Sequence, residues 1–476
     1  MKQARSILAV LLCGVLLAAL CGCAGTPDAS GDGGSQAASD ASGSGRAEVS
    51  QEFLDSLKGL DMKVTYPWTV EKRGDSVDAD IMWDHVDQVN AKYGCNITLE
   101  SGRATYSQVM VTSLLGKKPM GDVLMCQDTN FPDWYNAGIF CDLTEAAKTA
   151  GIDFSDEIFN QDVIQYTNVN GEQIGFYYGY DAPSSIFYNK RLLSEAGLED
   201  PHALLKKGEW TFAKMEEYAR LLKKTDANGN VEVWGLGAWG SSDFLAQCVS
   251  ANGGSIVGVD ENGKPKINLT DPATMEAMEY MYRMAVTNQT LDAVDPASWE
   301  AKMHDFIGGK YAMLLGTNST LNFCYRLGMQ DEYGVITFPV GPSNKDGKTD
   351  CMTNITFFFI PKLNEEKAAQ YLFLMDALST IDTRSAEEQF AQTYALRLTD
   401  ENSYNQYFER THTCPRFELI YLSGCMWTEP GIGEISGALS SGTSTPGAIS
   451  DKLSSMLQTA LNDKWGQMTI TGNLPK

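Results

Sequence analysis

The chain has 476 residues, a length that suits two or three structural units. Its 61 acidic and 37 basic side chains give a formal charge of −24, which excludes nucleic-acid binding as a leading hypothesis. Hydrophobic residues make up 43% of the chain, enough for sizeable cores, so the composition argues against global disorder. No apolar run of spanning length follows the N-terminal segment, which excludes a multi-span membrane protein.

The N-terminal segment predicts export followed by lipid anchoring. Residues 1–22 begin with Lys2 and Arg5 and continue with an apolar run over residues 7–20, the pattern of a secretory signal peptide. An uncleaved membrane anchor is the alternative, but the run is short for one. The letters LCGC at residues 20–23 resemble a bacterial lipobox, which implies that Cys23 is lipidated and becomes the new N-terminus.

A tether is predicted between the lipid and the body, from Cys23 to residue 50. Residues 24–49 are nearly all Gly, Ser, Ala, Thr and Asp, and they cannot bury enough surface to offset chain entropy. Such a segment behaves as a flexible linker. We therefore expect a body that is held at the outer face of the bacterial cytoplasmic membrane.

The body alternates predicted strands and helices. The β-prone runs are residues 62–66, 96–99, 122–125 and 174–178. The helical patterns are residues 81–93, 106–115, 212–224, 272–287 and 365–378. This alternation predicts parallel α/β sheets, with Leu99 and Met125 ending parallel strands, and ligands collect at the carboxyl ends of such strands.

Sequence motifs for catalysis or metal binding are not found. The histidines His85, His202, His304 and His412 are far apart and are predicted to lie at the surface. No cysteine pair in the body has C-x-x-C spacing, and most body cysteines have apolar neighbours, which favours buried thiols over disulfides. No G-x-S-x-G elbow occurs. We expect no metal, no cofactor and no catalytic residue, although a carboxylate pair for glycoside hydrolysis stays open.

Two turn sequences resemble ligand-binding loops. Residues 226–232 begin like an EF-hand but lack its terminal bidentate Glu, so a hairpin turn is favoured over a calcium site. Residues 258–264 nearly spell a phosphate loop, but Pro265 stands where Ser or Thr would bind magnesium. We interpret both segments as turns.

Aromatic side chains stand beside small polar ones at several places. These segments are residues 128–135, 176–181, 234–239 and 426–427. Aromatic faces offer flat apolar platforms, and Asp and Asn can pair with hydroxyl groups, a combination that suits a sugar. Core packing is the alternative for each of these aromatic residues, since most Trp and Tyr fill cores.

Several segments follow one another in an order that is specific for a protein family. They read GDVLM at 121–125, AGIFCDLT at 137–144, IGFYYGY at 174–180, IFYNKRLL at 186–193, EAGL at 195–198, EWTF at 209–212, FIGGKYAMLLG at 306–316, FPVGP at 338–342 and LSSGTSTP at 439–446. In this order they resemble the extracellular solute-binding proteins of ABC sugar importers, the group that includes maltose-binding protein. The resemblance covers nearly all of residues 60–476.

The resemblance implies an α/β fold with two lobes, the type II periplasmic-binding-protein fold, with a hinge and a ligand cleft between the lobes. The first lobe would comprise residues 51–180 and 338–388, and the second residues 181–337 and 389–476. The chain would cross between them near residues 180–181, 337–339 and 385–395.

The resemblance also implies ligand-contacting positions. They lie after a first-lobe strand, at the first crossing, in two second-lobe loops and near the C-terminus, and they are Gln127, Asp128, Asn130, Tyr180, Asp181, Trp239, Asp243, Asn318 and Trp427. The sequence departs from the maltose-type pattern, which has Trp where Cys126 stands and a cleft Glu near Ala182. Specificity for maltodextrin is therefore not expected.

The implied function is that of a monomeric, lipid-anchored binding protein, not an enzyme. It would capture a carbohydrate, with an oligosaccharide favoured, and deliver it to the permease subunits of an ABC transporter. Two alternatives stay open: a binding protein for a non-sugar solute such as a polyamine or peptide, and an exported enzyme acting on glycans. Asp128, Asp181 and Asp243 would permit polyamine binding.

Overall fold

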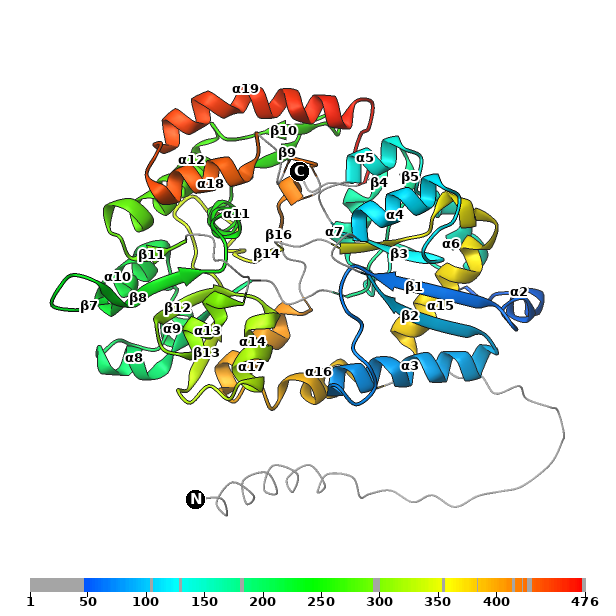
Figure 1. Ribbon diagram of the computed structural model, residues 1–476, viewed down its shortest axis with the longest axis horizontal. Coiled ribbons are helices and arrows are strands. Elements are labelled where there is room, and N and C mark those ends of the chain that lie inside the picture. The colour runs from blue at the N-terminus through cyan, green and yellow to red at the C-terminus, as the bar shows by residue number, and fades with distance from the viewer. Residues whose placement is uncertain are drawn as a thin grey trace, which may run out of the picture. The chain divides into compact units, whose positions relative to one another are not determined.

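The computed structural model describes residues 47–102, 106–127, 131–179, 184–293, 300–352, 356–382, 384–412, 416–421, 423–425 and 430–472. The predicted signal peptide, Cys23 and nearly all of the tether lie outside these residues. Residues Gly45–Lys476 form one compact unit, whose described residues contain two larger β-sheets flanked by helices and three two-stranded sheets (Figure 1). Within the described ranges, no helix combines the length and apolarity that crossing a membrane takes.

The first sheet has four strands in the order β15-β3-β1-β2. Strands β1 (Asp61–Tyr66), β2 (Asn96–Ser101) and β3 (Val123–Gln127) are parallel, and β15 (Thr356–Phe359) runs antiparallel to β3. Helices α3 (Val77–Tyr93), α6 (Thr144–Ala150) and α15 (Ala368–Thr380) pack together beside this sheet. We call the sheet and its helices the first lobe.

The second sheet has six strands, with β11-β8-β12-β6-β13 in order and β7 (Lys224–Thr225) paired to β8. Strands β8 (Val231–Ala238), β11 (Leu291–Asp292) and β12 (Tyr311–Gly316) are parallel to one another. Strand β6 (Ser185–Asn189) runs antiparallel to β12 and to β13 (Tyr333–Ile336). We call this sheet and its helices the second lobe.

The remaining elements are helices and short strand pairs. The helices are α2 (Gln51–Ser56), α4 (Tyr106–Leu115), α5 (Phe131–Asn136), α7 (Gln161–Tyr166), α8 (Lys190–Glu195), α9 (Pro201–Lys206), α10 (Phe212–Leu222), α11 (Ser241–Ala251), α12 (Pro272–Tyr282), η2 (Arg283–Thr287), α13 (Ala301–Ile307), α14 (Asn318–Arg326), η3 (Lys362–Lys367), α16 (Ala386–Tyr394), α17 (Glu401–Arg410), η4 (Leu419–Tyr421), α18 (Ile432–Ser441) and α19 (Pro446–Trp465). The strand pairs are β4 (Asn168–Val169) with β5 (Glu172–Gln173), β9 (Val257–Val259) with β10 (Pro265–Ile267), and β14 (Cys351–Met352) with β16 (Arg416–Phe417).

Strands β3, β6 and β12 are buried on both faces of their sheets, which is why they read as nearly continuous apolar runs. Along β3, Leu124 and Cys126 belong to one hydrophobic cluster, whereas Val123 and Met125 belong to another. In the second sheet Ile186 and Tyr188 of β6 face one cluster and Phe187 faces a different one. This alternation follows the two-residue period of a strand, with helices covering each face.

Most predicted elements are confirmed. Three of the four predicted strands coincide with β1, β2 and β3, and all the helical patterns that we named fall on helices. The expected strand at residues 174–178 is wrong. There, Phe176 makes an isolated bridge to Phe358, and the strand pairing ends at Gln173. The aromatic residues of this segment pack in the core instead, as the parallel rings of Tyr177 and Phe358 show.

Both turn-like loops are hairpin turns. Asp226 lies between β7 and β8, and its Oδ1 accepts hydrogen bonds from the backbone N–H groups of Asn228 and Asn230. Asp260 binds the N–H groups of Asn262 and Lys264 in the same way between β9 and β10. The described cysteines are buried, as predicted. Among the described residues, no group of three or more metal-ligating side chains occurs.

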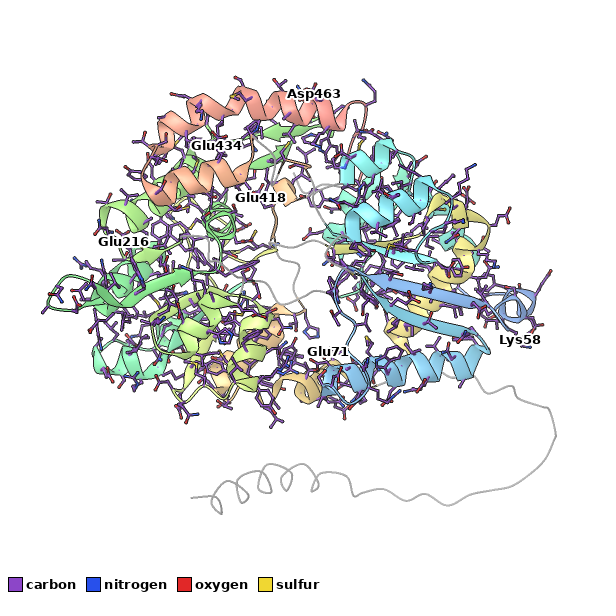
Figure 2. The ribbon with its side chains drawn as sticks, viewed as in Figure 1. Lys58, Glu71, Glu216, Glu418, Glu434 and Asp463 are labelled. Atoms are coloured by element: carbon purple, nitrogen blue, oxygen red, sulfur yellow. The ribbon has the colours of Figure 1, made fainter. Side chains whose placement is uncertain are left out.

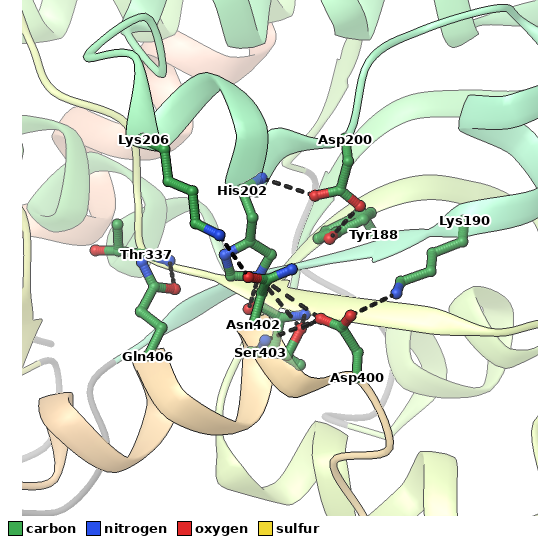
Figure 3. Close-up of polar contacts among 11 residues, drawn as sticks. Tyr188, Lys190, Asp200, His202, Lys206, Thr337, Asp400, Asn402, Ser403 and Gln406 are labelled. Atoms are coloured by element: carbon green, nitrogen blue, oxygen red, sulfur yellow. Dashed lines mark hydrogen bonds and ion pairs between the residues drawn. The ribbon is translucent and has the colours of Figure 1, made fainter.

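The prediction of a surface position is wrong for His202, which is only 4% exposed. Figure 3 shows it in a polar network that joins α9, β13 and α17. Its Nε2 lies 3.0 Å from the carbonyl oxygen of Val335 and 3.3 Å from Ser403 Oγ. Ser403 Oγ donates to Asp400 at 2.5 Å, and Asp400 pairs with Lys190 at 2.9 Å. Burial lowers the pKa of His202, so the ring is neutral at pH 7.

A second buried ionisable group, Glu418, precedes η4 in the second lobe (Figure 2). Its two carboxylate oxygens accept hydrogen bonds from the backbone N–H groups of Ile256 and Val257, at 2.9 and 2.8 Å. Burial nevertheless raises its pKa from 4.5 to about 7, because desolvation outweighs these hydrogen bonds. Glu418 thus joins the segment before η4 to the β9–β10 hairpin.

We predict that Glu418 makes the protein less stable as the pH rises from 4.5 to about 7. Over this range the native state binds more protons than the unfolded state, so the free energy of unfolding falls with rising pH. Glu418→Gln should remove this part of the pH dependence. Urea unfolding between pH 4.5 and 8 tests it, with Glu434→Gln on α18 as the surface control. A slope in Glu418→Gln identical to that of the wild type would contradict the prediction.

Candidate functional site

The strand ends of the second sheet gather at one edge. Strands β8 and β12 are parallel, and Ala238 at the end of β8 pairs with Leu315. The antiparallel neighbour β6 begins at this same edge, because Ser185 pairs with Gly316. Parallel α/β sheets hold ligands outside the carboxyl ends of their strands, so this edge is the first place to look for a binding site.

Trp239 and Asn318 lie at this edge. Trp239 directly follows β8, and Asn318 opens α14 two residues after β12. The indole Nε1 of Trp239 and the amide Oδ1 of Asn318 are both buried and have no hydrogen-bond partner among the residues that the structure describes. One turn farther along α14, Oδ1 of Asn322 is likewise buried and has no partner among the described residues. Buried polar atoms are nearly always paired, so this group points to a ligand that supplies the missing partners.

Asp243 lies in the first turn of α11, the helix that follows Trp239. The helix is buried along its whole length, and Asp243 itself is 5% exposed. Burial raises the pKa of the nearby Cys351 thiol, and the carboxylates of Glu418 and Asp243 raise it further. Asp243 therefore stands beside β14 in the interior, close behind the edge that carries Trp239.

The carboxyl edge of the first sheet carries two further candidate residues, Gln127 and Trp68. Gln127 ends β3, opposite Thr356 of β15. Strand β1 ends at Tyr66, and Trp68 follows two residues later with 44% of its surface exposed. The ring of Trp68 lies 5.8 Å from that of Tyr66, which in turn contacts Phe358 edge-on at 5.8 Å. Packing on the core holds this exposed indole in place, so it can serve as an apolar platform.

A buried ion pair fixes the segments around the edge of the second sheet. Arg410, at the end of α17, donates through Nε to both carboxylate oxygens of Asp350, at 2.9 and 3.0 Å. Its other nitrogens bind Ser185 Oγ at 2.7 Å and the carbonyl oxygen of Ser184 at 2.9 Å. Thr337, just after β13, donates to Asp350 at 2.8 Å. One guanidinium thereby joins the start of β6 to the chain leaving β13.

The structure places Trp239 and Asn318 at one sheet edge, Asp243 behind this edge in the first turn of α11, and Gln127 at the end of a first-lobe strand. The other predicted positions, Asp128, Asn130, Tyr180, Asp181 and Trp427, lie outside the described residues.

Trp68, Asn322 and the pair Arg410–Asp350 are not among the residues predicted from the sequence. The rule that selected residues after β3 would also have selected Trp68 after β1. Asn322 could have been found from its spacing, since it stands four residues after Asn318 on one helix face. No local sequence pattern indicates that Arg410 pairs with Asp350, because 60 residues separate them.

This fold and this site can now be compared with known proteins. The family model described as "Bacterial extracellular solute-binding protein" matches residues 74–377. The chain belongs to this family of solute-binding proteins. No curated protein that was compared with the chain matches it.

Solved structures of other solute-binding proteins share the fold. An ABC substrate-binding protein from Listeria monocytogenes in complex with cycloalternan has a TM-score of 0.58 at 15% identity, over 86% of this chain and 100% of that one. The GacH receptor of Streptomyces glaucescens, solved unliganded and with acarbose, has a TM-score of 0.59 at 16% identity, over 85% and 99%. UgpB from Mycobacterium tuberculosis with glycerophosphocholine has a TM-score of 0.60 at 16% identity, over 86% and 98%. At such identities the likeness establishes the two-lobe α/β fold of the family.

If the side-chain oxygen of Asn322 binds a ligand, the Asn322 side chain should not stabilise the protein when that ligand is absent. Asn322→Ala removes an unpaired buried oxygen and improves helix propensity, so we expect the free energy of unfolding to rise by about 0.5–1 kcal/mol. Asn90→Ala, the matched change inside α3, should lower it by about 1–3 kcal/mol, because Asn90 Oδ1 accepts the backbone N–H of Ile97 at 2.8 Å. Chemical denaturation of both variants without ligand measures the two changes in the free energy of unfolding. Equal destabilisation by the two would contradict the prediction.

Proposed function

We propose that this chain captures a carbohydrate, with an oligosaccharide favoured, between its two lobes and delivers it to an ABC permease. The observation that carries the proposal is a set of three buried atoms that have no partner among the described residues. They are Trp239 Nε1 and Asn318 Oδ1 at the carboxyl edge of the second sheet and Asn322 Oδ1 one turn along α14. One atom is a donor and two are acceptors. A sugar hydroxyl both donates and accepts, so a single class of ligand group satisfies all three.

The aromatic side chains support the same ligand class. Trp68 at the edge of the first sheet offers an exposed ring, and Trp239 at the edge of the second sheet offers both a ring and an indole N–H. Pyranose rings present apolar faces and polar rims, so they need flat aromatic surfaces together with hydrogen-bonding groups. Cycloalternan and acarbose, the ligands of two structural relatives, are carbohydrates, which agrees with this choice.

Polyamines and phosphodiesters fit the described groups less well. A polyamine needs exposed carboxylates, and Asp243, which is 5% exposed, is the one described residue among the three acids considered for that role. A phosphodiester such as glycerophosphocholine, the ligand of UgpB, needs a cation or several N–H donors. The described positions Trp239, Asn318 and Asn322 supply no cation, and Arg410 is already paired with Asp350.

The proposal is for a binding protein without catalytic activity. The described Ser–His–Asp contact, Ser403 with His202 and Asp400, is an unsuitable nucleophile site. Ser403 is 1% exposed, donates to Asp400 and accepts the backbone N–H of Val335 at 2.9 Å. Its hydroxyl is fully engaged in docking α17 onto β13, which is a structural task.

The proposed setting is the outer face of the cytoplasmic membrane. Removal of residues 1–22 and lipidation of Cys23 would anchor the body through the tether up to residue 50, as a monomer that meets permease subunits. The proposed lobes are residues 51–180 with 338–388 and residues 181–337 with 389–476. Phe390 of α16 packs in the same cluster as Phe187 of β6, so we propose to move the end of the first lobe from residue 388 to a point before α16, which begins at Ala386.

We expect thermal-shift screening of residues 50–476 to identify an oligosaccharide ligand. The panel contains neutral oligosaccharides, spermidine, glycerophosphocholine and short peptides. A ligand that binds only the native state adds about 2.7 kcal/mol of stability at a hundredfold excess over its Kd. A shift with an oligosaccharide that is recovered uncleaved supports the proposal. A shift only with spermidine, glycerophosphocholine or a peptide would overturn the ligand class, and cleavage of the oligosaccharide would overturn the non-enzymatic reading.

The hit is then tested on matched variants. Trp68→Ala and Asn318→Ala should each weaken binding about tenfold or more, because each removes one platform or hydrogen-bonding group. Tyr325→Ala is the control for Trp68, since Tyr325 is similarly exposed, at 47%, but lies toward the far end of α14. Isothermal titration calorimetry measures all three. Loss of affinity in Tyr325→Ala alone would place the site elsewhere.

A further inference from the structure

The last described residues of the chain connect the two lobes. Helix α19 ends at Trp465 in the second lobe, and the chain turns at Gly466 and continues to Gly472 between two hairpins (Figure 1). One hairpin, β9–β10, lies under α19, and the other, β4–β5, packs beside α7 of the first lobe. We call residues 466–472 the C-terminal strap.

On the second-lobe side the strap is held by the turn of β9–β10. Lys264 Nζ donates to the carbonyl oxygens of Gly466 and Met468, at 2.9 and 2.8 Å. The backbone N–H of Ile470 donates to the carbonyl oxygen of Gly263 at 2.9 Å. Gly263 has a φ of +78°, and a Cβ there would lie 2.4 Å from the carbonyl oxygen of Ile470. This turn therefore needs glycine both for its backbone angle and for its contact with the strap.

On the first-lobe side the strap pairs with the β4–β5 hairpin. Ile470 bridges Val169 in an antiparallel sense, with Asn170 N–H donating to the carbonyl oxygen of Thr469 and Thr471 N–H to that of Asn168, both at 2.9 Å. Asn170 Oδ1 also accepts the backbone N–H and the hydroxyl of Thr469, each at 2.9 Å. The backbone of the strap is thus hydrogen-bonded to both hairpins at once.

Apolar packing and an ion pair add to these hydrogen bonds. Trp465, Met468 and Ile470 are each 3% exposed or less, and they share one hydrophobic cluster with Val169 and Phe131 of the first lobe. The rings of Phe131 and Trp465 lie 5.9 Å apart. At the end of α19, Lys464 Nζ pairs with Asp133 at 2.9 Å.

We propose that the C-terminal strap is a pivot between the lobes, which restricts how far they open and thereby sets ligand affinity without touching the ligand. This inference rests on the proposed function only for its effect on affinity. Both lobes are hydrogen-bonded to the same short strap. When the lobes bend relative to each other, their points of attachment to the strap therefore stay close together. A strap that limits opening raises the population of the binding-competent state, and the apparent Kd falls in proportion.

Two side-chain changes test the strap without altering its backbone. Asn170 has a φ of +52°, which glycine adopts freely, so Asn170→Gly removes the bonds of its side chain to Thr469 and leaves the turn intact. Thr471→Val removes the hydroxyl that donates to Asn168 Oδ1 at 2.5 Å and accepts the N–H of Gly171 at 2.8 Å. Gln289→Gly is the control, because Gln289 also has a positive φ, +53°, in the turn before β11.

The first measurement is small-angle X-ray scattering of the chain from residue 50, and it needs no ligand. In Asn170→Gly/Thr471→Val we expect a larger radius of gyration than in the wild type, and in the Gln289→Gly control we expect the radius of gyration of the wild type. An unchanged radius of gyration in a variant that is folded by circular dichroism would overturn the pivot. Because no ligand is involved, this result stands whether or not the proposed function is correct.

The second measurement is the Kd of the oligosaccharide found by screening. We expect the double variant to bind about tenfold more weakly, while its radius of gyration with saturating ligand equals that of the wild type. Unchanged affinity together with an enlarged ligand-free form would overturn the link between strap and affinity. If the wild-type chain binds no oligosaccharide, the proposed function fails, and the scattering result alone decides the pivot.

Discussion

The ion pair between Arg410 and Asp350 is the constraint on which the binding site depends. Both residues are largely buried, and an unpaired charge there would be costly, so each needs the other and its surrounding hydroxyl and carbonyl groups. Through Ser185 and Thr337 the pair holds the start of β6 and the end of β13 at one place. The carboxyl edge that carries Trp239 and Asn318 therefore lies beside chain segments that the ion pair holds in place.

The candidate site differs from this ion pair, since three of its buried polar atoms have no partner among the described residues. A folded chain normally pairs its buried polar groups, as the networks around His202 and Glu418 illustrate. Trp239, Asn318 and Asn322 depart from this rule at the same sheet edge. Leaving them unpaired lowers the stability of the ligand-free protein, which is a common feature of binding sites that gain their stability from the ligand. In our proposal the C-terminal strap also contributes to ligand affinity, because it limits how far the two lobes open in the ligand-free protein.

Sequence patterns were sufficient for the elements and for part of the site. The strands β1, β2 and β3 read as apolar runs with turn signals, and Trp239, Asp243 and Asn318 follow from family resemblance at strand ends. Residues 174–178 have the composition of a strand but form only isolated bridges, from Phe176 to Phe358 and from Tyr178 to Phe159. His202, Arg410 and the strap contacts were not predictable. Their partners lie 60 to 299 residues away along the chain, so these contacts exist only in the folded structure.

The most direct test of the account follows the indole N–H of Trp239 by nuclear magnetic resonance of the ¹⁵N-labelled chain. Its signal is identified by its loss in Trp239→Phe, and saturating oligosaccharide is then added. The account predicts that this signal moves downfield as Nε1 gains an acceptor. The signals of Trp210 and Trp465, which already donate to the carbonyl oxygens of Thr337 and Ser423, should stay in place. Saturation of the protein with the Trp239 signal unmoved would contradict the account.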